Sequence, residues 1–479
     1  MKRLIGALAL AALGGCATLS AQPSSEARWW LTTADGKQKL AEQAALPPQA
    51  APTAGTIIHI DPSKRYQRIV GFGASITDAS ADLIQGLPVE KREALLQELF
   101  GRRNGGLGLS FTRLTVGASD FSSTHYSLDD SPGNRSDPML AHYSIAPAKK
   151  AMLPTARRAL AINPDLKVMI SPWSAPAWMK TSRSLIKGKL DPEAYPAFAA
   201  YLARTVEEFG REGVPVFALS IQNEPDFEPE NYPGMRMSPA DRAAFIGGHL
   251  GPLLEKRRIT TKIFEWDHNW DKPEQPLGTL ADPVANRYIA GVAWHCYAGD
   301  VSAQSKVRQA YPDKEVWFTE CSGGEWAPKF GETLGWMTRN LIIGTTRHWA
   351  RGSLMWNLAL DPKYGPHLGG CGDCRGVVTI DPVTGAIERN VEYYALGHAS
   401  RFVLPGARRI DSDNGIDGIE TVAFLNPDGR TIAVIVHNSS KELRDVTFAA
   451  PTERFAVRIP AGAVATLVWD RQARRRTIR

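Results

Sequence analysis

Several common sequence signatures are missing from this chain, and each absence excludes a class of protein. The 479 residues include only five cysteines, and a single Cys-x-x-Cys pair without a second one argues against a zinc ribbon. No basic stripe with interleaved aromatic residues is present, so nucleic acid is not an expected partner. The Gly-rich stretch GFGAS at 71–75 lacks the later glycine and the helical context of a phosphate-binding loop. No lysine ends an apolar run in the position of a Schiff-base former, which argues against an aldolase-like enzyme.

The composition that remains is that of an ordinary globular protein. Hydrophobic residues make up 43% and charged residues 22% of the chain, and the length allows one large domain and a smaller one. The formal charge of +6 is concentrated at the two ends, in Lys2, Arg3, Arg471, Arg474, Arg475, Arg476 and Arg479. The rest of the chain is therefore close to neutral, and the basic balance says nothing about a partner.

The first 22 residues, MKRLIGALALAALGGCATLSAQ, predict export. A basic tip precedes an apolar stretch of signal-peptide length that is too short to cross a bilayer. The residues Leu13 to Cys16 fit a bacterial lipobox, which predicts lipidation of Cys16 and membrane anchoring through it. The alternative is a secretory signal that is cleaved after Ala17 or Ala21. Both interpretations predict that the mature protein leaves the cytoplasm. The first predicts a periplasmic or outer-membrane lipoprotein of a bacterium, and the second predicts a secreted protein.

The other four cysteines lie in two kinds of sequence environment. Cys371 and Cys374 lie in a Gly-rich loop and, outside the cytoplasm, predict a local disulfide. A metal site that recruits His367 is the alternative. Cys296 and Cys321 are flanked by apolar strand-like residues and are predicted to be buried thiols.

Eight apolar, β-leaning runs alternate with helix-like stretches between residues 68 and 394, which predicts an α/β fold of the (β/α)8 TIM barrel type. An open doubly wound sheet is the competing interpretation. The barrel is favoured because each run ends in polar or aromatic residues, as in barrel enzymes. The runs are 68–76, 109–117, 166–174, 216–224, 261–269, 291–297, 315–322 and 352–360.

The pattern changes after residue 394, where short alternating runs indicate an appended antiparallel β-sandwich domain. The run TIIHI at 56–60 is expected to complete that domain. The predicted organisation is a signal segment (1–21), a linker with strands that join the β domain (22–67), the barrel (68–394), the β-sandwich (395–471) and a basic tail (472–479).

Two glutamates end the fourth and seventh runs. Glu224 and Glu320 would face one another across the mouth of a closed barrel, about 5 Å apart, which is the separation in retaining glycosidases. Asn223 beside Glu224 would bind the sugar 2-hydroxyl, and Arg113 and Tyr297 would orient Glu320 and keep it ionised. Several tryptophans at strand ends, which are either sugar-stacking walls or core residues, accompany them: Trp173, Trp178, Trp266, Trp326 and Trp356.

These motifs together resemble glycoside hydrolase family 30. The resemblance is carried, in order, by GFGASITDAS, RLTVGASDFS, SPWSAPAWMK, QNEPDF, HCY, FTECSGG and MWNLALD. It covers most of residues 55–470 and implies a retaining mechanism without a metal or organic cofactor. It implies Glu224 as the general acid/base and Glu320 as the nucleophile. It further implies sugar-binding or nucleophile-supporting roles for Asp78, Trp173, Asn223, Tyr297 and Trp356, with Arg113 and His295 as supporting residues.

Several functions are compatible with this resemblance. The first is a β-glucoside hydrolase similar to glucosylceramidases, and the second is an endo-β-1,6-glucanase. The loop after Glu224 and the loop around Cys371 look microbial, and such loops shape the leaving-group side, where function transfers least between relatives. A third possibility, from a different class, is a lipoprotein that binds carbohydrate without cleaving it. The expected partner is a β-linked glucoside or glucan, and the oligomeric state is left open.

Overall fold

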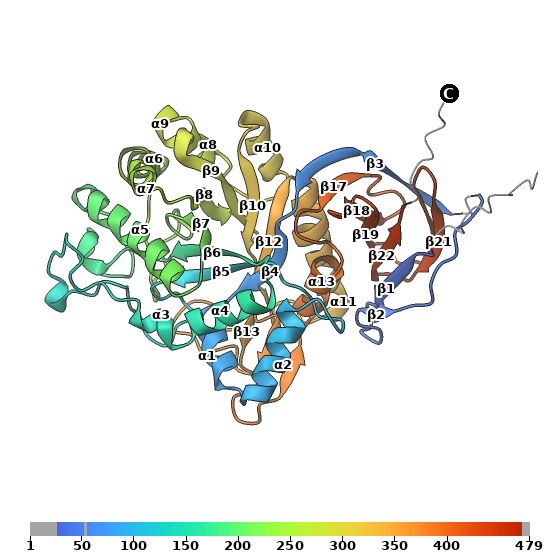
Figure 1. The fold of residues 1–479 in the computed structure, drawn as a ribbon, viewed down its shortest axis with the longest axis horizontal. Helices are drawn as coiled ribbons and strands as arrows, with labels where there is room; N and C mark the ends of the chain where they lie inside the picture. Colours follow the sequence, from blue (N-terminus) through green and yellow to red (C-terminus); the bar gives the residue numbers. More distant parts are fainter. Residues whose placement is uncertain (1–25, 52–54, 472–479) are drawn as a thin grey trace, which may run out of the picture.

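Eight parallel strands close into a barrel, which confirms the predicted fold class (Figure 1). The structure, a computed structural model, describes residues 26–51 and 55–471, so Cys16 and the basic tail lie outside the described residues. The barrel strands are β4 (Gly71–Ser75), β5 (Phe111–Val116), β6 (Lys167–Pro172), β7 (Val216–Ser220), β8 (Lys262–Asn269), β9 (Ile289–His295), β10 (Glu315–Glu320) and β12 (Ala350–Asn357). Each of the eight predicted runs overlaps one of these strands.

Large and small side chains share the inside of the barrel. Trp317 of β10 stacks on Phe264 of β8 with ring centroids 4.7 Å apart, and Phe111 of β5 packs against the same indole. The neighbouring strands contribute Ala218 and Ala293, which leave the room that these rings occupy. The barrel interior is thus a packed core, and any site has to lie at its ends.

Gly73 explains why the GFGAS stretch is glycine-rich. A Cβ atom at this position would lie 1.9 Å from the carbonyl oxygen of Phe111 on the neighbouring strand. The glycine is therefore required for the close approach of β4 and β5 at the point where these two residues pair.

Helices surround the barrel, and local sequence signals begin several of them. Ser238 caps α6 in a capping box with Asp241, and a proline follows each of several caps. The helices are α1 (Asp78–Gly86), α2 (Val89–Phe100), α3 (Ala146–Lys150), α4 (Met152–Ile162), α5 (Tyr195–Arg211), α6 (Pro239–Phe245), α7 (Gly251–Arg257), α8 (Glu274–Leu280), α9 (Pro283–Tyr288), α10 (Ala303–Ala310), α11 (Phe330–Met337), α12 (Thr345–Arg347) and α13 (Val391–Ser400). Single π-helical turns at Ile246–Leu250 and Thr338–Gly344 join α6 to α7 and α11 to α12. Within the described ranges no helix has both the length and the apolar character needed to cross a membrane.

Short strands decorate the loops at the carboxyl end of the barrel. A two-stranded sheet pairs β11 with β14, and a three-stranded sheet contains β13, β15 and β16. Their bounds are β11 (Gly323–Gly324), β13 (Ala359–Leu360), β14 (Cys374–Arg375), β15 (Val378–Ile380) and β16 (Ile387–Arg389).

The second domain is one nine-stranded sheet in the order β2-β1-β22-β19-β18-β17-β3-β20-β21. The sheet folds over on itself, because Phe455 near one edge packs on Trp469 near the other, with ring centroids 5.2 Å apart. The long strand β3, which contains the TIIHI run, pairs with both β17 and β20. The bounds are β1 (Arg28–Thr32), β2 (Ala41–Glu42), β3 (Thr56–Arg68), β17 (Arg408–Ser412), β18 (Ile419–Leu425), β19 (Thr431–Asn438), β20 (Arg444–Ala449), β21 (Arg454–Ile459) and β22 (Val464–Asp470).

Helix α13 joins the two domains and shares one hydrophobic core with both (Figure 1). Its His398 is fully buried and lies between Thr32 of β1 and Thr466 of β22. Trp30 of β1 packs on Phe402 just after the helix, with ring centroids 4.4 Å apart. The β domain is therefore fastened to the barrel by a continuous apolar contact.

Candidate active site

A cavity of about 570 Å³ opens at the carboxyl end of the barrel strands. Several residues predicted to form the site line it: Trp173, Asn223, Glu224, Tyr297, Glu320 and Trp356. They lie at or just after the ends of five different strands, so only closure of the barrel brings them together.

The two predicted carboxylates lie close together in this cavity. One oxygen of Glu224, one oxygen of Glu320 and one nitrogen of His295 all lie within 4.8 Å of one another. This separation leaves no room for a water molecule between two carboxylates on opposite faces of a sugar, and it matches the geometry of retaining glycosidases.

The backbone around Glu224 directs this side chain into the cavity. Strand β7 ends at Ser220, and the amide of Asn223 then donates to the carbonyl of Pro172 at 2.8 Å. The amide of Glu224 donates to the carbonyl of Asp267 at 3.1 Å, and Glu224 itself has a φ of +47°. A left-handed conformation of a non-glycine residue is strained and is typical of functional sites. The Asn-Glu-Pro sequence thus ends the strand so that the carboxylate projects over the barrel.

Arg113 and Tyr297 hold Glu320 from two sides. The buried guanidinium of Arg113 donates to one carboxylate oxygen, and the Tyr297 hydroxyl donates to the other at 3.0 Å. The same guanidinium donates to Asn223 Oδ1 at 2.7 Å, which leaves the Asn223 amide hydrogens as the donors on the cavity side. One arginine therefore fixes both the second carboxylate and the amide that precedes the first.

Asp267 is the buried centre of this network, although no sequence pattern had indicated it. Its Oδ2 accepts hydrogen bonds from Arg113 at 2.6 Å and from Ser171 and Ser220 at 2.9 and 2.5 Å. A bulge between Trp266 and His268 turns the side chain inward, with a φ of +54° at Asp267. The charged residues within the run EWDHN are a signal that could have indicated a buried polar site. The alternation of side chains along an ideal strand, however, does not show where a bulge will turn one of them inward.

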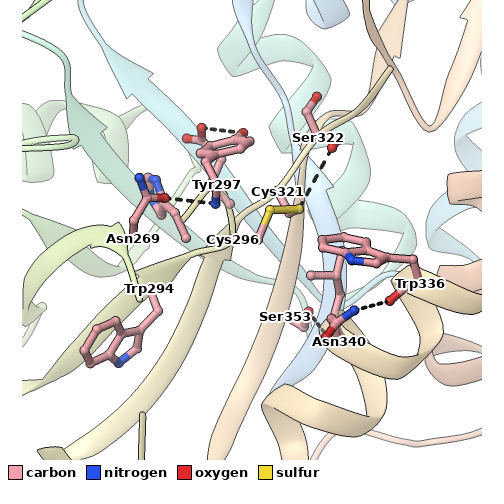
Figure 2. Close-up of a disulfide and its surroundings, with 12 residues drawn as sticks. Asn269, Trp294, Cys296, Tyr297, Cys321, Ser322, Trp336, Asn340 and Ser353 are labelled. Atoms are coloured by element: carbon pink, nitrogen blue, oxygen red, sulfur yellow. Dashed lines mark hydrogen bonds between the residues drawn. A yellow bond between two sulfur atoms is a disulfide. The ribbon is translucent and has the colours of Figure 1, made fainter. Parts of the chain in front are cut away.

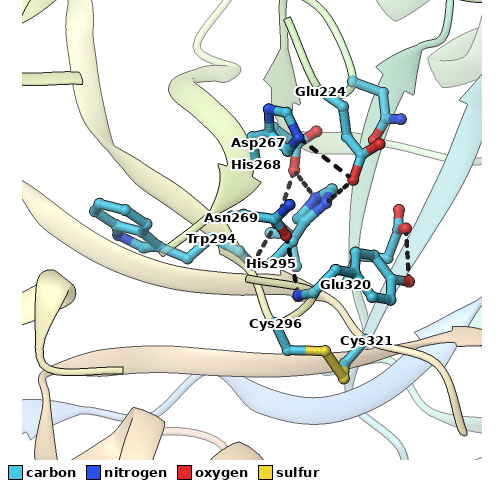
Figure 3. A network of polar contacts seen from close by, with 12 residues as sticks. Glu224, Asp267, His268, Asn269, Trp294, His295, Cys296, Glu320 and Cys321 are labelled. Carbon is cyan, nitrogen blue, oxygen red and sulfur yellow. Dashed lines mark hydrogen bonds and ion pairs between the residues drawn. A yellow bond between two sulfur atoms is a disulfide. The ribbon is translucent and has the colours of Figure 1, made fainter. Parts of the chain in front are cut away.

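His295 connects the first carboxylate to this centre (Figure 3). Its Nδ1 lies 3.1 Å from Glu224 Oε1 and its Nε2 lies 3.1 Å from Asp267 Oδ1. Burial acts to lower the pKa of His295, but the carboxylates of Glu320, Asp267 and Glu224 outweigh it and raise this pKa to about 9. The imidazole is therefore protonated at neutral pH in the free protein.

The pKa values of the two glutamates move in opposite directions. Burial acts to raise the pKa of Glu224, but the charges of His268, His295 and Arg113 lower it below its ordinary value. Burial raises the pKa of Glu320, the charge of Glu224 adds to this effect, and His295 and Arg113 oppose it. The free site thus stores a proton on His295, next to Glu224.

Aromatic rings form one wall of the cavity. Trp173 and Trp356 stack with centroids 4.9 Å apart and an interplanar angle of 20°, and the Arg113 guanidinium lies over both rings. Trp326 also lines the cavity, whereas Trp178 and Trp266 are buried elsewhere. Of the five tryptophans at strand ends, three border the cavity and two are core residues.

The structure places Asp78 and Asp120 differently with respect to the cavity. Asp78 is not among the residues that line the cavity, and its carboxylate accepts hydrogen bonds from Ser122 and Tyr126 at 2.7 and 2.8 Å. Asp120 from the RLTVGASDFS motif lines the cavity instead. Burial raises the pKa of Asp120 well above its ordinary value, with Glu320 and Glu224 adding to the effect. The sugar-binding or supporting role of Asp78 stays a prediction.

The prediction that Cys296 and Cys321 are free thiols is wrong. They form a disulfide with Cα atoms 5.4 Å apart, which Figure 2 shows beneath Tyr297. His295 of β9 is paired with Glu320 of β10, so the residue that follows each of them meets the other. Apolar flanks alone cannot reveal this register. Cys371 and Cys374 also form a disulfide, in a loop that borders the cavity.

Glu224, His295 and Glu320 are close enough to hold a metal ion by distance alone. However, both nitrogens of His295 already face carboxylates, and its raised pKa favours a cation over a metal ligand. The donor set therefore fits a proton-storing cluster better than a metal site.

Comparisons with known proteins agree with this geometry. Residues 69–403 match the glycosyl hydrolase family 30 TIM-barrel domain, and residues 406–467 match the family 30 beta sandwich domain. Among curated proteins, an endo-1,6-beta-D-glucanase of Trichoderma harzianum is 32% identical over 85% of each chain. The lysosomal acid glucosylceramidase of Mus musculus is 27% identical over 87% of this chain and 84% of its own.

A solved structure gives the same result. The structure of the endo-β1,6-glucanase BT3312 matches with a TM-score of 0.86 and 32% identity, over 93% of this chain and all of the other. The two family domains are matched in order along the barrel and the folded-over sheet. The chain belongs to glycosyl hydrolase family 30.

Proposed function

We propose that this enzyme is a retaining endo-β-1,6-glucanase, with Glu224 as general acid/base and Glu320 as nucleophile. The observation that carries the proposal is the pair of carboxylates within 4.8 Å, each with its own set of partners. Glu320 is held by Arg113 and Tyr297 in an orientation for attack on an anomeric carbon. Glu224 has a proton donor beside it in His295.

The proton on His295 supplies the acid. Its Nδ1 and Glu224 Oε1 share one hydrogen bond, which is satisfied with the proton on either atom. Nε2 donates to Asp267 in both cases. When a neutral sugar fills the cavity, transfer of this proton to Glu224 creates no new net charge, so the step has a low electrostatic cost.

Catalysis then proceeds in two displacements. Glu224 donates its proton to the glycosidic oxygen while Glu320 forms a bond to the anomeric carbon, and the leaving chain departs as an alcohol. Glu224 then takes a proton from a water molecule, which attacks the same carbon and releases Glu320. Trp173 and Trp356 would pack against the sugar ring, while the Asn223 amide and Asp120 would bind its hydroxyl groups.

The choice of β-1,6-glucan is supported by the relatives and by the shape of the site. Relatives named endo-1,6-β-glucanases are 31–32% identical, against 27–30% for those named glucosylceramidases. The cavity is open and bordered by the exposed rings of Phe227 and Trp326. An open site bordered by aromatic rings suits attack within a chain.

A substrate panel tests this proposal. The enzyme should release oligosaccharides from the β-1,6-glucan pustulan, and the first product should have the β-anomeric configuration by proton NMR. Glu320→Gln is the matched control, since it removes the nucleophile and keeps its volume. Release of the α-anomer would contradict the mechanism. Turnover of glucosylceramide without cleavage of pustulan would replace the proposed substrate by the glucosylceramidase alternative.

We also propose export with lipidation of Cys16, on the basis of the N-terminal segment alone. Expressed in a bacterium, the protein should incorporate labelled palmitate and partition with membranes. A Cys16→Ser variant should do neither. Equal labelling of the two proteins would contradict lipidation.

A further inference from the structure

A second cavity continues from the active site along the surface of the barrel. It measures about 700 Å³ and shares Tyr297 and Trp326 with the catalytic cavity. A third cavity of about 570 Å³ follows and shares Lys329, Glu332 and Trp336 with the second. Its far end reaches the β domain at His437. The second and third cavities together form one path that leads away from the catalytic cavity at Trp326, called here the tryptophan groove.

The groove exposes aromatic rings to water. The exposed fractions are 45% for Tyr297, 55% for Trp326 and 44% for Trp336. Large aromatic residues grouped in one hollow of the surface indicate a binding site rather than scattered exposure. Figure 2 shows Tyr297 and Trp336 on either side of the Cys296–Cys321 disulfide, and Cys296 lines the groove.

The backbone positions both tryptophans of the groove. A Cβ atom on Gly324 would lie 1.9 Å from the six-membered ring of Trp326, so this ring lies directly on the backbone of strand β11. Trp336 is carried by the last turn of α11, with Met337 buried beside it. The two platforms are therefore fixed by the fold before any ligand binds, which reduces the entropy cost of binding.

The polar groups of the groove suit a neutral, hydroxyl-bearing ligand. Ser322 lines the groove, but its hydroxyl oxygen is buried, so the exposed aromatic rings rather than this hydroxyl are the groups that a ligand meets. The charged side chains are already paired, Lys329 with Glu332 at 2.9 Å and Arg339 with Glu420 at 2.7 Å. Paired charges give little attraction for an acidic or basic polymer, whereas exposed aromatic rings pack against the faces of sugar rings.

We propose that the tryptophan groove binds further glucosyl units of the β-glucan chain whose scissile bond lies in the catalytic cavity. Trp326 and Trp336 serve as stacking platforms. This inference rests on the proposed function of the site, because the groove is continuous with it. The groove makes the enzyme prefer long chains to short glucosides.

Trp336→Ala tests the inference most cleanly, since Trp336 lines the groove but not the catalytic cavity. Binding is measured by affinity electrophoresis in pustulan gels with the inert Glu320→Gln background. Turnover is measured on pustulan and on an aryl β-glucoside with the active enzyme. Loss of one stacking ring should weaken pustulan binding and kcat/KM on pustulan by about tenfold. Turnover of the aryl glucoside should change less than about twofold.

Two further variants separate the groove from general damage. Trp336→Phe keeps a ring and should restore most of the pustulan binding. Met139→Ala removes a side chain that is 84% exposed and far from the groove in sequence, and it should have no effect. Thermal unfolding of each variant should match that of the parent, so that a change in binding is not a change in folding.

The outcomes distinguish the inference from the function on which it rests. Cleavage of pustulan by the parent enzyme with unchanged binding and kcat/KM in Trp336→Ala would overturn the groove and keep the proposed function. Equal losses on pustulan and on the aryl glucoside would also overturn the groove. Absence of pustulan cleavage by the parent would contradict the proposed function, and the groove would then stand only on glucan binding that depends on Trp336.

Discussion

Two fully buried histidines show how differently the barrel mouth and the domain junction use the same side chain. His295 at the mouth faces carboxylates with both ring nitrogens, and its pKa is raised to about 9. His398 at the junction faces the hydroxyls of Thr32 and Thr466 at 2.8 and 3.0 Å. Burial lowers the pKa of His398 to about 3. Burial alone neutralises an imidazole, and neighbouring carboxylates reverse the effect.

The junction satisfies a neutral imidazole completely. The hydroxyl of Thr466 donates to the His398 carbonyl at 2.7 Å, so it accepts from Nδ1. The hydroxyl of Thr32 accepts from the amide of Leu40 at 2.8 Å, so it can donate to Nε2. The mouth, in contrast, concentrates charges that only a cation can balance. The junction is built for stability, whereas the mouth holds a transferable proton.

The largest effect is expected from Glu320→Gln, which removes a carboxylate from the mouth. The variant should lose kcat by a factor on the order of 10⁴, because the nucleophile is absent. The pKa of His295 should fall, because Glu320 contributes most to raising it. Enzyme kinetics and NMR titration of the imidazole measure both. The titration of His398 should not change, and an unchanged His295 titration would contradict the assigned charge cluster.

Acid should destabilise the protein through the junction. The pKa of His398 is depressed, so below about pH 6.5 the unfolded chain binds a proton that the folded chain excludes until about pH 3. This costs about 5 kcal/mol of unfolding free energy at the acid end of the range. Denaturant unfolding of the parent and of His398→Gln, compared from pH 7 to pH 4, measures it. The stability difference between the two proteins should shrink as pH falls, and a constant difference would contradict the prediction.

Alkali should act on the mouth in the opposite direction. The raised pKa of His295 gives a stabilisation that is complete below about pH 6.5 and is lost as pH rises through about 9. Its size is about 3 kcal/mol. Activity should fall over the same alkaline range, since the proton for Glu224 is lost. On the acid side, activity should fall at a pH above the ordinary pKa of a glutamate, because the pKa of Glu320 is raised.

The variant His295→Gln checks this prediction. Its unfolding free energy should depend less on pH between 7 and 10 than that of the parent, and His398→Gln is the matched control that should keep the alkaline dependence. If the parent enzyme kept its full activity at pH 10, the proton that Glu224 donates would not come from His295.

The smallest effect is expected from removal of the disulfides, one of which lies directly after His295 and Glu320 at the barrel mouth. The disulfide Cys296–Cys321 spans 25 residues and Cys371–Cys374 spans 3. Replacing both cysteines by alanine should lower the unfolding free energy by about 2 kcal/mol more for the first pair, because its loop is longer. Activity should also fall a few-fold for the first pair, since it follows His295 and Glu320 directly. Equal stability losses in the two double variants would contradict the loop-length argument.

Much of the fold was predictable because its signals are local. Each apolar run became a barrel strand, and the hairpin around Asn426–Gly429 pairs β18 with β19 as its alternation predicts. The same holds for Glu224 and Glu320, which end their strands with recognisable neighbours. The acid and the nucleophile remain predictions as roles, but their positions follow from the strand order alone.

What was missed depends on register and on distance through space. Asp267 enters the site through a bulge, which shifts one side chain to the opposite face of the strand. Cys296 meets Cys321 because two parallel strands pair with His295 opposite Glu320. Asp120, which lines the cavity, was not predicted, because only the path of the loop after the strand decides which carboxylate faces the cavity.

The sequence by itself determined the strand rhythm, the two acidic strand ends and the family, since these follow from residue order and short-range periodicity. The tertiary structure alone decided the charge state of His295, the pairing of the cysteines and the groove that leads away from the site. These properties depend on which atoms lie within a few ångströms of one another, and electrostatic interactions, disulfides and cavities form only at such distances.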